Sequence, residues 1–238
     1  MIVEFVGLPA SGKSFLAQEV KARVQSDWGA DEPAPSITTS SEKRTRSRLP
    51  FIAGALFSHV VRYPLRTSEA IYHLYRRQVP TARKFLRYAS YQLYVCEELR
   101  RARRGNELHL ADQGYLQQVW LVHLMGAAST PADIDRHLDL YHPWLAPDIV
   151  VWVEVDQQTR MQRGQARGNA IDPAFFDPEH PAIKRDVASY RELKAVVRER
   201  AADSAVDIQF ERIENTTDAI DDNVAHLSSI ILERWHEQ

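Results

Sequence analysis

A glycine-containing segment near the N-terminus has the residue types and the spacing that bind phosphate groups. Residues 7–14 read Gly-Leu-Pro-Ala-Ser-Gly-Lys-Ser and fit the pattern Gly-x4-Gly-Lys-Ser. Gly7 and Gly12 permit backbone conformations and close approaches that a side chain would block. The backbone N–H groups around residues 10–14 are expected to form a concavity for an anion at the start of a helix, where the helix dipole adds positive potential. The segment therefore predicts a phosphate-binding loop.

Two side chains of this loop predict that the phosphates belong to ATP bound with Mg²⁺. We expect the Lys13 ammonium to reach the β- and γ-phosphates and the Ser14 hydroxyl to be a ligand of the metal ion. The loop follows an apolar run at residues 2–6 and precedes a helical pattern at residues 13–24, which is the strand–loop–helix context that the motif requires. The residues predicted to bind the nucleotide here are Gly7, Pro9, Ala10, Ser11, Gly12, Lys13, Ser14 and Phe15.

A carboxylate after a later apolar run is the second candidate for chemistry. Residues 107–111 read as a short strand, and Asp112, Gln113 and Gly114 follow it. Open parallel sheets bind their ligands at the carboxyl ends of the strands. We therefore predict that Asp112 holds Mg²⁺, through water, or accepts a proton from the attacking group. The alternative is a turn residue or a helix N-cap.

Three arginines form a third candidate. Arg160, Arg163 and Arg167 are spaced i, i+3 and i+7, so they are expected on one face of a helix over residues 157–167. Guanidinium groups placed in this way can neutralise charge on a phosphate in transfer. We predict a lid at residues 157–170, with a solvated basic face as the alternative. The predicted catalytic residues are thus Lys13, Asp112, Arg163 and Arg167.

Strands alternate with helices along the chain, which predicts an α/β fold with a parallel sheet covered on both faces. The strands are expected at residues 2–6, 36–40, 107–111, 149–155 and 208–213. The helices are expected at residues 13–24, at three places within 49–104 with the last at 81–104, and at residues 115–125, 131–145, 157–167, 181–202 and 217–235.

Composition sets the broad class of the protein. The 238 residues, 44% apolar and 26% charged, fit one soluble domain over residues 1–238. The single cysteine, Cys96, excludes an internal disulfide framework, and no apolar run is long enough to cross a bilayer, so we expect a cytoplasmic location. Residues 43–104 hold 15 Lys/Arg and three acidic residues, a net charge of +12 in a chain whose total is −2. This basic segment indicates an anionic partner or a solvated helical surface.

Taken together, these segments resemble the nucleoside and nucleotide kinases of the P-loop superfamily, particularly the thymidylate kinase-like and deoxynucleoside kinase-like groups. The resemblance covers residues 3–14, 110–114, 153–156, 163–168 and 212–217. It implies a three-layer P-loop NTPase fold with a five-stranded parallel sheet of order 2-3-1-4-5, a helical insertion at residues 43–104 and an arginine lid. It also implies phosphoryl transfer from ATP, a nucleotide contact from Arg163, and a contact with adenine from the loop at Asn215.

The sequence departs from these kinases on the side of the phosphoryl acceptor. Gln113 stands where the family has an arginine, and residues 29–104 lack the family's substrate motifs. The candidate acceptor-binding residues are Glu42, Arg44, Gln113 and Tyr91, although an aromatic stripe such as the one around Tyr91 is more often part of a core. We expect a polar or anionic small molecule, and a nucleoside, a nucleotide, a sugar or another metabolite all fit.

Two other classes of function stay open. The first is an ATP-binding protein or ATPase that acts on a membrane or a protein partner through the basic segment. The second is a polynucleotide kinase, although the basic segment contains no recognisable nucleic-acid-binding motif, which argues against nucleic acid as the partner. A homodimer is compatible with the sequence.

Overall fold

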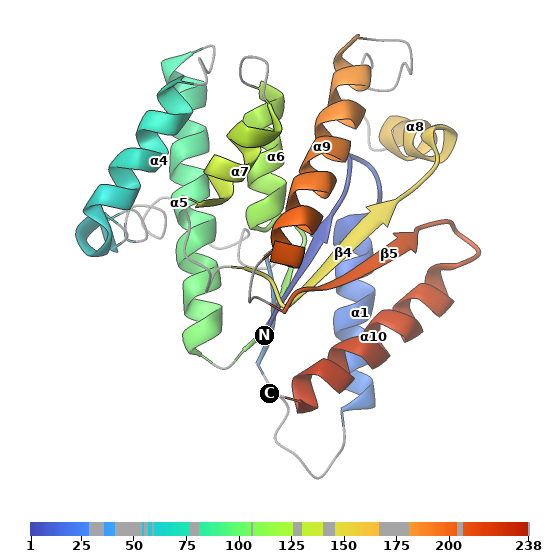
Figure 1. The fold of residues 1–238 in the computed structure, drawn as a ribbon. Coiled ribbons are helices and arrows are strands. Elements are labelled where there is room, and N and C mark those ends of the chain that lie inside the picture. The colour runs from blue at the N-terminus through green and yellow to red at the C-terminus, as the bar shows by residue number, and fades with distance from the viewer. Residues whose placement is uncertain are drawn as a thin grey trace.

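The computed structural model describes the chain except for residues 29–35, 41–53, 55–56, 59, 77–80, 106, 126–129, 140–145, 167–180, 204–206 and 238. Its centre is a five-stranded parallel sheet with the strand order β2-β3-β1-β4-β5, of which β4 and β5 are labelled in Figure 1. This is the order that the family resemblance implied. The strands are β1 (Ile2–Val6), β2 (Ile37–Thr39), β3 (Leu108–Ala111), β4 (Ile149–Glu154) and β5 (Gln209–Glu214).

Helices cover both faces of the sheet, as the alternation of strands and helices predicted. In Figure 1, α1 and α10 lie against one face, while α5, α6 and α9 lie against the other. The helices are α1 (Lys13–Asp27), α4 (Pro64–Arg76), α5 (Ala82–Arg104), α6 (Tyr115–Met125), α7 (Pro131–Asp139), α8 (Gln157–Ala166), α9 (Pro181–Asp203) and α10 (Ile220–His236). No helix in the described part of the chain is both long and apolar enough to cross a membrane.

The central strands are apolar along their whole length because both of their faces are covered. Every residue of β1 is buried, and β4 is buried from its start to Val153. Side chains of β1 alternate between the two layers: Ile2 and Val6 pack towards α5, α6 and α9, whereas Val3 and Phe5 pack towards α1 and α10. This two-sided core fixes where β1 ends and the phosphate loop begins.

The basic middle segment contains α4 and α5, which account for two of the three helices expected there. Residues 57–58 and 60–62 are also helical, and the chain before them is described only in part. In Figure 1, α4 lies on the outer side of α5. Large apolar side chains are exposed on α4, where Leu65 is 78% and Tyr72 61% accessible. The inner face of α5 contributes Val95 and Leu99 to the core.

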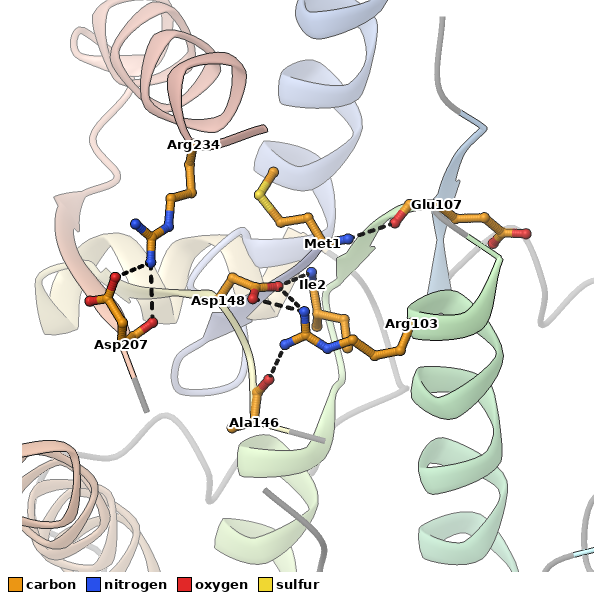
Figure 2. A network of polar contacts seen from close by, with 8 residues as sticks. All are labelled: Met1, Ile2, Arg103, Glu107, Ala146, Asp148, Asp207 and Arg234. Atoms are coloured by element: carbon orange, nitrogen blue, oxygen red, sulfur yellow. Dashed lines mark hydrogen bonds and ion pairs between the residues drawn. The ribbon is translucent and has the colours of Figure 1, made fainter. Parts of the chain in front are cut away.

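A polar network ties the strands together at the end of the sheet opposite the phosphate loop (Figure 2). Asp148, just before β4, accepts a hydrogen bond of 2.6 Å from the Ile2 amide. Arg103 of α5 donates to Asp148 at 2.8 Å and to the Ala146 carbonyl at 2.7 Å. The Met1 amino group donates to a backbone carbonyl just before β3 at 3.0 Å. These contacts join β1, β4 and α5 at the start of β1, away from the phosphate loop.

Candidate active site

The phosphate loop lies between β1 and α1 and contains two left-handed residues, Ala10 with φ 64° and Gly12 with φ 88°. A Cβ atom on Gly12 would lie 2.3 Å from the Asn215 side-chain nitrogen, and one on Gly7 would lie 2.5 Å from the Val153 carbonyl oxygen. Neighbouring atoms therefore require a glycine at both positions, and at Gly12 the left-handed backbone requires it as well. Ala10 adopts a conformation that costs an L-residue about 1–2 kcal/mol, and such strain is typical of functional loops.

The start of α1 is open towards the loop. No side chain in the described part of the chain caps the helix at Gly12, and the first helical hydrogen bond runs from the Leu16 amide to the Gly12 carbonyl at 3.0 Å. The preceding N–H groups of the first turn thus point towards the loop, where they can bind an anion. Pro9 forms the turn of the loop, which closes with a 3.2 Å hydrogen bond from the Ser11 amide to the Leu8 carbonyl.

Lys13 lies along the loop. Its Nζ atom donates to the Gly7 carbonyl at 2.7 Å and to the Leu8 carbonyl at 3.1 Å. The ammonium group is thus held at the rim of the cradle by weak acceptors that a phosphate oxygen can replace, because charge-assisted hydrogen bonds are stronger than those to neutral carbonyls. Phe15, on the first turn of α1, is 46% exposed.

Ser14 and Asp112 meet although they are far apart in the sequence. The Ser14 hydroxyl donates a short hydrogen bond to Oδ2 of Asp112. Asp112 is 1% exposed, and its Oδ1 atom has no hydrogen-bond partner in the part of the chain that the structure describes. A hydroxyl and a carboxylate are the hard oxygen ligands that Mg²⁺ prefers, and a buried carboxylate oxygen without a hydrogen-bond partner can bind a cation. The residues present therefore fit the metal ion that the loop implies.

Arg163 and Asn215 close the loop from the side of β4 and β5. Arg163 of α8 donates to the Ser11 carbonyl at 3.3 Å and to the Asn215 carbonyl at 2.9 Å. The Asn215 side chain is buried and donates to the same Ser11 carbonyl at 2.7 Å. In this structure, then, Asn215 holds the loop, and its contact with adenine stays a prediction.

Arg160 does not share the surface of Arg163. Its side chain is buried, donates to Gln157 at 2.5 Å, and has its pKa lowered by burial, partly offset by attraction to Asp186 of α9. Burial raises the pKa of Asp186 to about 6, and the nearby Arg160 counteracts that rise. The prediction that Arg160 shares a helix face with the other two arginines is thus wrong, because Arg160 faces α9. Arg167 lies outside the described residues, as does the rest of the predicted lid beyond α8, residues 168–170.

On the acceptor side, the structure brings Gln113 and Tyr91 together. The Tyr91 hydroxyl of α5 donates to the Gln113 side-chain oxygen at 3.2 Å, and the Tyr91 ring stacks on Tyr94 at a centroid distance of 6.0 Å. Gln113 follows directly after Asp112, so this pair borders the carboxylate. The other two acceptor candidates, Glu42 and Arg44, lie outside the described residues.

The sequence reasoning missed Glu4 and Gln117. Glu4 lies on β1, and one of its carboxylate oxygens accepts a 3.0 Å hydrogen bond from the Gln117 amide. Burial raises the Glu4 pKa to about 7, against the opposing effect of backbone N–H groups at the start of α6. The Gln117 side-chain oxygen in turn accepts a 3.2 Å hydrogen bond from the Gly7 amide. The signal for Glu4 was an acidic residue inside an apolar strand.

Comparisons of the sequence with known proteins identify neither a family nor a relative. No family model matches the chain, and no curated protein matches it. Among solved structures, a deoxyadenosine kinase from M. mycoides with dCMP and dCDP bound is similar at 14% identity and a TM-score of 0.48, covering all of both chains. The same kinase with dCTP or dATP bound gives 14% identity and a TM-score of 0.47, covering 96% of this chain and all of that one. A likeness of this size leaves the substrate to be inferred from the residues of this chain.

Proposed function

We propose that this protein is a P-loop kinase, which uses ATP and Mg²⁺ to phosphorylate a polar or anionic small molecule. The observation that carries the proposal is the hydrogen bond between Ser14 and Asp112 beside the open start of α1. An anion cradle alone would fit any phosphate ligand. A cradle with a hydroxyl, a buried carboxylate and a lysine beside it fits a triphosphate whose terminal group is to be transferred.

Each side chain has a part in the proposed transfer. The acceptor oxygen attacks the γ-phosphorus, the bond to the β–γ bridging oxygen breaks, and ADP leaves. Asp112 takes the proton of the acceptor, while Lys13 and Arg163 stabilise negative charge on the phosphates as it shifts. Ser14, and Asp112 through water, would hold Mg²⁺, which would supply further neutralisation of charge on the β- and γ-phosphates. Arg167 is proposed to add a second guanidinium group from the lid.

The acceptor is proposed to bind beside Gln113 and Tyr91. The amide of Gln113 offers both a donor and an acceptor, whereas the arginine of the kinases it resembles offers donors alone. An acceptor that presents both kinds of polar group, such as a nucleoside, a sugar or an aminoglycoside, suits this pair. Glu42 and Arg44 are proposed to contribute from the segment after β2.

Phosphate transfer to a panel of acceptors tests the proposal. ADP formation is measured with nucleosides, nucleoside monophosphates, sugars and aminoglycosides, for the wild type and for Asp112→Asn. We expect one class to raise ADP formation well above the basal rate, and the substitution to reduce that rate about 10²–10⁴-fold, as loss of a general base does. Tight ATP binding with no stimulation by any acceptor would instead favour an ATPase that acts on a macromolecular partner.

A further inference from the structure

Glu4 is a buried carboxylate, and it has no cationic partner among the residues that the structure describes. It has no exposed surface, and the ion pairs of the described residues do not include it. Its Oε1 atom accepts the Gln117 amide at 3.0 Å, and the amides of Leu116 and Tyr115 also stabilise the ionised form. Glu4 therefore lies at the N-terminal end of α6, where backbone N–H groups and the helix dipole favour a negative charge.

Gly114 allows this close contact. A Cβ atom at position 114 would lie 2.5 Å from Cδ of Glu4 and 2.8 Å from its Cγ, so no other residue type fits without movement. Gly114 is two residues beyond Asp112, and α6 begins at the next residue, Tyr115. The Glu4 side chain thus packs against the turn that joins Asp112 to α6.

Gln117 extends the contact to the phosphate loop. Its side-chain oxygen accepts the Gly7 amide at 3.2 Å, and the Gly7 carbonyl holds Nζ of Lys13 at 2.7 Å. The line of hydrogen bonds thus runs from Glu4 through the first turn of α6 to Gly7 and Lys13. The same turn of α6 follows the strand end that carries Asp112. Hydrogen bonds thus connect the buried Glu4 carboxylate to the phosphate loop, and the helix that Glu4 contacts begins three residues after Asp112.

We propose that Glu4 and Gln117 are positioning residues for the nucleotide: Glu4 anchors the start of α6, and Gln117 transmits that position to the phosphate loop. Neither side chain touches the nucleotide. Their effect comes from the placement of Gly7 and of the phosphate loop that it begins, since small displacements of positioned groups are costly for binding and transfer. The inference rests on the proposed function, because it assumes that the loop binds a nucleotide.

The chain offers a matched control for Gln117. Gln118 is the next residue of the same helix and is buried to a similar degree, 1% against 4% exposed. Its side-chain nitrogen has no hydrogen-bond partner within the described ranges. Gln117→Met and Gln118→Met thus remove equal amounts of buried amide, but only the first removes a contact with the loop.

The test measures Mg-ATP affinity by calorimetry and the melting temperature without nucleotide. We expect Gln117→Met to weaken affinity about tenfold, the value of a lost well-placed hydrogen bond, and Gln118→Met to change it less than about twofold. Both variants should melt at similar temperatures. Equal affinities of the two variants would overturn the inference, whereas a wild type that binds no Mg-ATP would overturn the proposed function itself.

A double-mutant cycle with Glu4→Gln tests the link between the two residues. Glu4→Gln alone is the second variant if Gln117→Met does not fold. Glu4→Gln keeps one carbonyl oxygen for the amides of α6 but removes the charge. If Glu4 acts through Gln117, the double variant should lose no more affinity than the weaker-binding single variant. Losses that multiply would show two independent roles and contradict the proposed line of contacts. If Glu4→Gln alone binds Mg-ATP as the wild type does, Glu4 is not a positioning residue.

Discussion

Replacement of Glu4 by glutamine should remove a dependence of stability on pH that is built into β1. Burial raises the pKa of this carboxyl from 4.5 to about 7, so the folded protein binds its proton more tightly than the unfolded chain does. The stabilising effect of that proton is fully present below pH 4.5. It is lost as the pH rises through about 7, where the folded protein must hold the carboxylate in its ionised form.

The size of the effect follows from the two pKa values. A move from 4.5 to about 7 corresponds to about 3 kcal/mol of unfolding free energy, at about 1.4 kcal/mol per pH unit. Between pH 5 and pH 8, the wild type should therefore lose about 2–3 kcal/mol of stability relative to Glu4→Gln. Asp186, whose pKa is raised to about 6, titrates in both proteins and cancels in the comparison.

Urea unfolding of the two proteins at four pH values from 5 to 8 measures this difference. The unfolding free energy depends linearly on urea concentration, and its extrapolation to zero urea gives the stability at each pH. Equal slopes would show that both proteins expose the same amount of surface on unfolding. The stability of the wild type relative to the variant should fall steadily across the range. Curves that stay parallel would refute the reasoning, because they would mean that Glu4 is not titrated between pH 5 and 8.

Two further substitutions probe the contacts at the start of β1 and the phosphate loop that follows this strand. Asp148→Ala removes the acceptor of the first strand amide and of Arg103, and should lower the unfolding free energy by about 1–3 kcal/mol in urea, with nucleotide affinity little changed. Gly12→Ala places a Cβ atom 2.3 Å from the Asn215 side chain at a φ of 88°, and should abolish the rise in melting temperature that Mg-ATP gives. Binding by that variant at wild-type strength would contradict the account of the loop.

The fold was predictable because its signals are local. The run at residues 2–6, the loop at residues 7–14 and the apolar segment at residues 149–155 each carry their own pattern. The order of the strands came from the resemblance to known kinases and was confirmed. The boundaries of most elements differ from the prediction by one to three residues, for instance at α1, which ends at Asp27 rather than near residue 24.

The contacts inside the site were less predictable because they join distant residues. The meeting of Ser14 and Asp112 followed from the rule that ligands bind at the carboxyl ends of parallel strands, but the link from Glu4 to Gln117 follows from no such rule. The prediction that Arg160 shares a face with Arg163 was wrong for a geometric reason. Residues three apart on a helix differ by about 60° in direction, since each residue turns the helix by about 100°. That angle is enough for Arg160 to face α9 while Arg163 faces the loop.

The central claim is that the loop at residues 7–14 binds Mg-ATP through Lys13, and thermal unfolding tests it most directly. Mg-ATP at about 100 times its dissociation constant should stabilise the wild type by about 2.7 kcal/mol, which raises the melting temperature by several degrees. Lys13→Ala removes the ammonium that lies against Gly7 and Leu8. We predict that this variant folds and gains no stability from Mg-ATP. Equal stabilisation of the variant and the wild type, or none in the wild type, would contradict the account.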